Sequence, residues 1–307
     1  MSRKPLYGMS VLSVLLGAVS YGLLSPLVKL AFDKGFTLEQ VTVHQTGLAM
    51  VLLWLLALVR FKRWKNPFRG GQWVKLSIIG IGGLTLTTVF FNQALERLDA
   101  SLAIVLLFQF TWITILLDSV SCKQWPGKFR LLAIVIVMIG TLLAVGILDE
   151  GLGRFDTLGV ILGLLSAVAY SLFIWWTGRL EGDQDPVIRS AVMMSAGFLL
   201  VMLLYGSRAI SSDAEGTLIG WGLLLGVLGQ VIPTVLFNIG IPRIGSSLAA
   251  LLGSLELPVA ALTAWAVLGE SISLMKLMGI VLILIGIGIA ELPSGPRSER
   301  LASLEEK

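Results

Sequence analysis

One acidic side chain, Glu256, lies at the midpoint of residues 244–268, where it is the only formally charged residue. A charged side chain at the centre of a bilayer costs about 2.5–3.5 kcal/mol on insertion scales, so this carboxyl group should face a cavity or a partner. Burial also favours the neutral acid, which can exchange a proton. The pattern predicts either a group that binds a substrate amine or carries a coupling proton, or a protonated structural contact between helices.

Two other titratable side chains are candidates for the same chemistry. Lys29 would either extend its amine to the membrane surface or face inward as a partner for an anionic group. His44 is the only histidine; it would be either a proton relay or a packed structural residue. Because one histidine and one cysteine cannot form an ordinary zinc site, we expect no metal, and the absence of a P-loop motif argues against ATP hydrolysis by that route. No cofactor is expected.

Uncharged polar and aromatic side chains complete the set of candidates. They are Tyr21, Tyr170, Asn92, Asn238, Gln109 and Trp112. Each would either line a solute pathway or, for the polar groups, join two helices by a hydrogen bond of about 1 kcal/mol. Pro26, Pro233 and Pro258 would either free backbone carbonyls for a polar ligand or simply bend their helices for packing.

The elements that must position these residues follow from composition. The chain has 307 residues, of which 56% are hydrophobic and 14% charged, and this excludes an ordinary soluble protein. Apolar runs of a length that crosses a bilayer recur throughout, and they must be helical because lipid cannot satisfy backbone groups. We therefore expect an all-α polytopic membrane protein. Its ten spans are predicted at residues 8–31, 38–59, 75–95, 100–120, 129–148, 157–178, 187–206, 217–240, 245–268 and 273–292.

The basic residues predict an orientation. Of the 23 lysines and arginines, 17 fall on the side of the membrane that carries both termini, and that side is expected to be cytoplasmic. The protein is thus predicted to be a multi-pass protein of a prokaryotic inner or plasma membrane. This distribution accounts for the net charge of +4 without a nucleic-acid partner. Either a monomer or a homodimer is compatible with the sequence.

An internal repeat divides the chain. Residues 88–104 align with residues 234–250 at an offset of 146, and they share threonine, asparagine, arginine and serine in one register. Gly140 and Gly286 keep that offset, while residues 17–23 align with 166–172 at an offset of 149. We interpret residues 1–148 and 149–292 as two five-helix repeats, followed by a polar cytoplasmic tail at 293–307.

The odd number of helices in each repeat has a consequence for topology. The second repeat must enter the membrane from the opposite side, which relates the two by a pseudo-two-fold axis in the membrane plane. In secondary transporters built this way, the substrate site lies near the midplane between the repeats.

The sequence resembles ten-helix EamA-type permeases of the drug/metabolite transporter superfamily. The resemblance rests on Tyr21-Gly22 with Lys29, on the asparagine-containing ends of the third and eighth helices, and on residues 246–270 and 279–289. It departs from the family pattern at Trp112, where the second repeat has Pro258, and at His44, where relatives often carry arginine. The resemblance implies transport of small metabolites.

We therefore expect a secondary active or facilitative transporter that works by alternating access. It would export amino-acid-like or amphipathic solutes, driven by protons or by the solute gradient. Two other classes remain as alternatives. A non-transporting scaffold or sensor would need long loops or tails, and an intramembrane enzyme would need a nucleophile–base set or metal ligands, of which Glu256 alone supplies neither.

Overall fold

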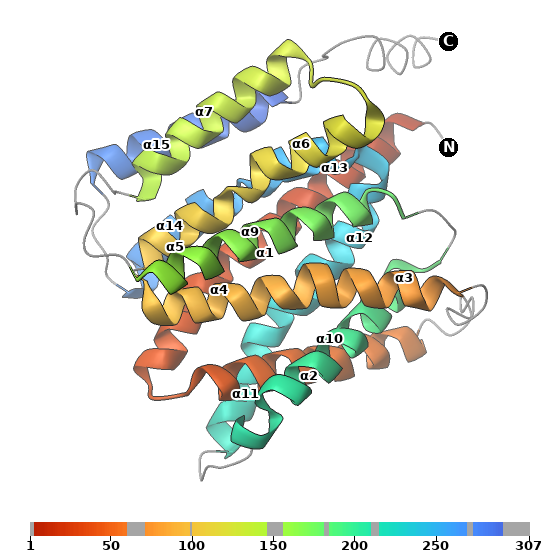
Figure 1. The fold of residues 1–307 in the computed structure, drawn as a ribbon, viewed down its shortest axis with the longest axis vertical. Helices are drawn as coiled ribbons and strands as arrows, with labels where there is room; N and C mark the ends of the chain where they lie inside the picture. Colours follow the sequence, from red (N-terminus) through yellow and green to blue (C-terminus); the bar gives the residue numbers. More distant parts are fainter. Residues whose placement is uncertain are drawn as a thin grey trace.

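The computed structural model describes residues 3–59, 71–98, 100–145, 156–180, 184–209, 215–268 and 273–290. The predicted tail, residues 293–307, lies outside these ranges. Regular structure in the described residues is helical, as the all-α prediction requires. The helices pack against one another as one bundle (Figure 1).

The first half of the chain forms α1 (Arg3–Asp33), α2 (Leu38–Val59), α3 (Gln72–Ile79), η3 (Gly80–Thr85), α4 (Leu86–Arg97), α5 (Ala100–Phe108), α6 (Phe110–Cys122) and α7 (Lys128–Val145). The second half forms α9 (Thr157–Thr177), α10 (Pro186–Ala209), α11 (Glu215–Gly226), η4 (Val227–Val231), α12 (Ile232–Ile244), α13 (Ser246–Gly253), α14 (Glu256–Leu268) and α15 (Leu274–Ala290). In Figure 1, α1 and α12 run obliquely to α2, α3 and α4. Among the described residues, eight stretches are long and apolar enough to cross a membrane. The two other predicted spans coincide with α7 and with α15, a shorter apolar helix, so the count of ten stays a prediction.

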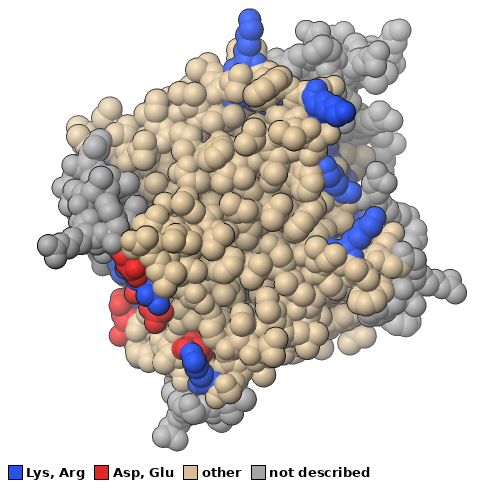
Figure 2. All heavy atoms as spheres, viewed as in Figure 1, with Lys and Arg blue, Asp and Glu red and all other residues tan. Residues whose placement is uncertain are grey.

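The outer surface of the bundle is apolar. Leucines such as Leu199 and Leu203 are 71% and 82% exposed. Figure 2 shows a broad face whose middle carries no charged side chain; the visible acidic side chains lie at its lower left together with basic ones, and other basic ones lie along its top and right edges. An exposed apolar belt of this extent is unfavourable in water and favourable against lipid.

Two π-helical turns interrupt long helices at corresponding places in the two halves. η3 joins α3 to α4, and η4 joins α11 to α12. Pro233 follows η4 and lacks the N–H that would bond the Gly229 carbonyl in a regular α-helix, which accounts for the wider turn there. η3 has no proline, but it holds three glycines, whose low helix propensity tolerates irregular winding. π-helical turns are rare and occur frequently at functional sites.

Two further spans break in the middle. The chain breaks at Gln109, between α5 and α6, and at residues 254–255, between α13 and α14. At the second break Pro258 cannot donate to the Ser254 carbonyl, which instead accepts from the N–H of Leu257 at 3.3 Å. The hydroxyls of Thr111 and Ser254 lie 3.4 Å apart, so the two breaks meet inside the bundle.

Glycines let the helices approach closely. A Cβ on Gly22 of α1 would lie 2.5 Å from the carbonyl oxygen of Glu256, and one on Gly140 of α7 would lie 2.9 Å from that of Gly279 in α15. Figure 1 shows α7 and α15 side by side at the top of the view. Close backbone approach through small residues is the usual basis of helix packing in membranes.

Asp156 caps the start of α9. Its carboxylate accepts from the N–H of Leu158 at 3.0 Å and from Arg97 at 3.2 Å, and these two interactions, chiefly the one with Arg97, lower the pKa of Asp156 below its ordinary value of 3.8. Because the folded state holds the carboxylate more strongly, its contribution to stability is present above pH 4 or so and is lost as the pH falls through the lowered pKa. We expect Asp156→Asn to melt at a lower temperature than wild type near pH 6, with the gap narrowing towards pH 3. A gap independent of pH would contradict this.

Candidate functional site

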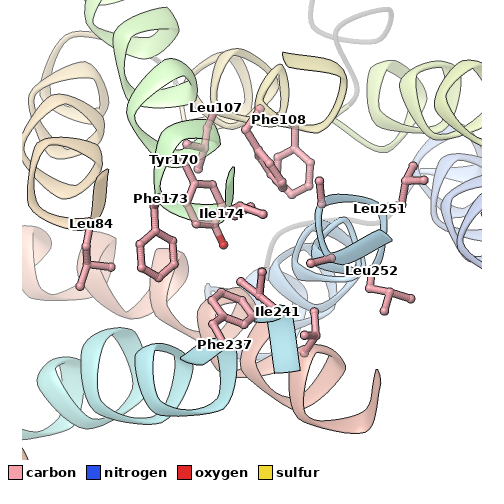
Figure 3. Packing of buried hydrophobic residues seen from close by; sticks show 14 of the residues in the cluster. Leu84, Leu107, Phe108, Tyr170, Phe173, Ile174, Phe237, Ile241, Leu251 and Leu252 are labelled. Carbon is pink, nitrogen blue, oxygen red and sulfur yellow. The ribbon is translucent and has the colours of Figure 1, made fainter. Parts of the chain in front are cut away.

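A group of aromatic rings lies at the centre of the bundle, and we call it the aromatic cluster: Tyr21, Phe110, Tyr170, Phe173 and Phe237. The rings come from α1, α6, α9 and α12. Tyr170 lies at its middle, with ring centroids 4.6 Å from Phe110 and 6.0 Å from Tyr21, the latter edge to face. Figure 3 shows Tyr170 and Phe173 on one helix facing Phe237 on another, with the Tyr170 hydroxyl directed between them. The cluster thus joins elements from both halves.

Glu256 is buried beside this cluster, with 6% of its surface exposed. It begins α14, directly after the break, and Gly22 packs on its backbone. Gly22 directly follows Tyr21 of the cluster, so the start of α14 lies against this part of α1. The acid therefore faces the protein interior, and not the lipid.

Two buried polar atoms here have no hydrogen-bond partner among the described residues. Within the described part of the chain, neither Oε2 of Glu256 nor the hydroxyl of Tyr170 makes a hydrogen bond, although both are buried. Buried polar groups are nearly always hydrogen-bonded, so an exception calls for an explanation such as a ligand. Three sequence-predicted candidates, Glu256, Tyr21 and Tyr170, are thereby brought to one place.

Asn92 and Asn238 lie elsewhere in the bundle and join helices. Asn92 donates to Thr42 Oγ1 of α2 at 3.2 Å, and Asn238 donates to Ser190 Oγ of α10 at 3.0 Å. Each bond thus links the third predicted span of its half to the second. In this structure both asparagines join two helices, which is the second of the two roles considered from the sequence. Oδ1 of Asn238 is nevertheless buried without a partner among the described residues.

Because the two hydrogen bonds are equivalent, removing either asparagine should destabilise the protein to a similar extent. We expect Asn92→Ala and Asn238→Ala each to lower the free energy of unfolding by about 0.6–1.7 kcal/mol, the range for interhelical hydrogen bonds in membranes. Thermal melting in detergent, with Thr42→Val and Ser190→Ala completing two double-mutant cycles, measures each coupling energy. A coupling energy near zero in both cycles would contradict the assignment.

The remaining candidates do not join the cluster. Trp112 is 40% exposed and donates to Gln109 Oε1 at 2.8 Å on the outer side of the α5–α6 break. Lys29 is exposed on α1. His44 is partly buried, with Nδ1 2.9 Å from the Gln40 carbonyl, and packs against Gly222.

The three prolines take different positions. Pro26 lies within the continuous helix α1, whereas Pro233 and Pro258 lie in the first turns of α12 and α14. The last two therefore accompany helix irregularities, and Pro258 is two residues from Glu256.

Two other buried polar residues, Gln45 and Ser20, were not among the sequence-predicted candidates, whereas Gln230 was open to the same two interpretations as Gln109. Both amide atoms of Gln45 are buried without a partner in the described residues. Gln230 donates to Thr88 Oγ1 at 3.3 Å, and Ser20 donates to the Leu228 carbonyl of η4 at 2.6 Å. Gln45 could have been recognised as an amide inside an apolar run; the phenylalanines of the cluster carry no such signal.

A polar junction formed by Asp118, Arg179 and Ser247 lies at the ends of three helices and was not predicted from the sequence. Asp118 of α6 accepts from Arg179, just after α9, at 3.1 Å and from the hydroxyl of Ser247 in α13. The Arg179 guanidinium lies 4.2 Å from the centroid of the Trp175 ring. The junction ties the first half of the chain to the second away from the aromatic cluster.

With this geometry in place, comparison with known proteins defines the class. The profile of the EamA-like transporter family matches residues 8–146 and again residues 157–291. The chain belongs to the EamA-like transporter family, and it is a membrane transporter by that membership.

Relatives agree with this membership. The chain is similar to the "Uncharacterized transporter YcbK" of Bacillus subtilis, at 24% identity over 92% of this chain and 94% of that one. It is also similar to the "Uncharacterized inner membrane transporter YicL" of Salmonella typhimurium, at 26% identity over 73% and 75%. A solved crystal structure shares the fold, with a TM-score of 0.72 at 18% identity over 94% of this chain and 98% of its own.

Proposed function

We propose that this protein is a secondary transporter that moves small organic solutes through a pathway between two inverted repeats, with Glu256 at the binding site. The observation that carries the proposal is the buried carboxyl group of Glu256, which lies beside the aromatic cluster and whose Oε2 has no hydrogen-bond partner among the described residues. An ionisable residue inside the membrane marks a substrate or proton pathway by default. Amphipathic organic solutes, one of the two classes expected from the sequence, fit a site that combines one acid with several aromatic rings.

Several features support the inverted-repeat arrangement. The family profile matches the chain twice, and π-helical turns, mid-span breaks and asparagine bonds recur in both halves at similar offsets. The helix breaks resemble the discontinuous helices that form substrate sites in other transporters. The repeat boundaries at 1–148 and 149–292 belong to this proposal.

The proposed orientation places both termini in the cytoplasm of a bacterial or archaeal cell. Its support is the excess of lysine and arginine on that side. The name of the Salmonella relative, which places that protein in an inner membrane, also supports it.

Flux into proteoliposomes tests the proposal. The purified chain is reconstituted and offered a panel of amino acids, amines and organic acids, with and without an imposed pH gradient, while protein-free liposomes serve as the control. We expect saturable uptake of at least one class of solute. If no solute moves under either condition, the proposed function is wrong.

A further inference from the structure

The charge of the site narrows the class of solute. We infer that the site between Glu256 and the aromatic cluster selects organic cations, namely amines with an apolar or aromatic body and no carboxylate. The inference rests on the proposed function and deepens it by naming the ligand chemistry.

The first step concerns what the buried polar atoms lack. Oε2 of Glu256 and the hydroxyl oxygen of Tyr170 can both accept hydrogen bonds, and within the described residues neither receives one. An ionised Glu256 can only accept, so a ligand that satisfies it must donate, and the Tyr170 oxygen can accept from the same group. A protonated amine carries three N–H donors and the positive charge that a buried carboxylate needs.

The second step concerns the surrounding rings. The Tyr21 ring lies between those of Tyr170 and Phe237, with centroids 6.0 Å from the first and 5.8 Å from the second, and Phe110 and Phe173 extend the group. Aromatic faces attract a desolvated cation, most strongly where several rings gather around it. The same rings offer apolar contact to the body of the ligand.

The third step excludes a ligand carboxylate. No lysine or arginine within the described ranges forms an ion pair with Glu256, and Lys29 is exposed on the surface of α1. Pairing with a ligand amine favours the ionised form of Glu256, and a zwitterionic amino acid would then bring its own carboxylate near this charge without a counter-charge among the cluster residues; like charges in a desolvated site repel. An amine without a carboxylate avoids this repulsion.

Binding of three probes that share a phenyl group and a short alkyl chain tests the inference. The full chain, purified in detergent, is titrated by calorimetry with 2-phenylethylamine as the cation, phenylalanine as the zwitterion and 3-phenylpropionate as the anion. We expect the amine to bind at least about tenfold more tightly than the other two, because it alone pairs with the acid without repulsion. Equal or weaker binding of the amine would overturn the inference.

Variants locate the site. We expect Glu256→Gln to weaken amine binding about tenfold or more, and Tyr170→Phe to weaken it about fivefold through the loss of one hydrogen bond. Glu39→Gln and Tyr205→Phe make the same chemical changes outside the cluster, so they should bind as wild type does. Glu39 pairs with Arg208, and Tyr205 accepts from Gln93. Thermal melting identifies any variant that fails to fold. If Glu256→Gln does not fold, the affinities of Tyr170→Phe and Glu256→Asp for the amine decide whether the inference holds.

The outcomes separate the two proposals. If proteoliposomes take up phenylalanine or 3-phenylpropionate and not the amine, the transport function stands and the cation inference falls. If no member of the panel is moved and the amine does not bind, both are wrong. If Glu256→Gln and Tyr170→Phe both bind the amine as tightly as wild type does, the amine does not bind between Glu256 and the aromatic cluster.

Discussion

Replacing Glu256 with glutamine is expected to abolish the effect of a pH gradient on transport. The amide is nearly the same size as the acid, so the packing around Gly22 and the aromatic cluster should survive, whereas the side chain can neither release nor take up a proton. We also expect the flux of the best wild-type solute to fall by at least about tenfold, or about 1.4 kcal/mol, because a charged ligand loses its counter-ion.

The measurement uses proteoliposomes with and without an imposed pH gradient. Asp156→Asn serves as the matched control, because it also turns an acid into an amide but at the exposed start of α9. It should keep both the flux and the response to the gradient. If Glu256→Gln responds to the pH gradient as wild type does, Glu256 does not carry the coupling proton.

The substitution Gly80→Ala is expected to destabilise the fold severely. A Cβ on Gly80 would lie 2.2 Å from the carbonyl oxygen of Met193 in α10, and the next atoms it meets also belong to that backbone. Backbone cannot rotate away as a side chain does, so η3 and α10 must separate. Overpacking in a core costs about 3 kcal/mol at the upper end of its usual range, or a melting temperature lower by about 6–10 °C.

Gly288→Ala is the control for that effect. Gly288 lies in α15, and a Cβ there meets nothing within 4 Å. Alanine should therefore be neutral or stabilise the helix by about 0.5–1 kcal/mol. Thermal melting of both variants in the same detergent makes the comparison. If Gly80→Ala has the same melting temperature as Gly288→Ala, the close approach of η3 to α10 is wrong.

The sequence predicted the helical membrane class because apolar runs of bilayer length leave few alternatives. It also indicated Glu256, since one charge in an apolar span is conspicuous, and it paired Tyr21 with Tyr170 through the repeat. The structure brings these three residues together. Their proximity needed the packing of α1, α9 and α14, which no local pattern describes.

Other features could not be predicted for physical reasons. Phe110, Phe173 and Phe237 stand among other apolar residues, so composition gives no sign that they share a cluster. The break at Gln109 has no proline, unlike the break before Pro258, and η3 likewise differs from η4. Trp112 lies in the middle of an apolar run, yet its helix turns it to the outer surface. Helix rotation and winding depend on tertiary contacts.

The two π-helical turns bear on the history of the protein. A π-helical turn holds one residue more than an α-helical turn, so each corresponds to a single-residue insertion in a regular helix. Under the proposed repeat, the simplest account is that one insertion preceded the gene duplication. The ancestor would then have been a single five-helix chain that already carried the wide turn. To assemble as the two halves do now, copies of that chain would have had to insert into the membrane in both orientations.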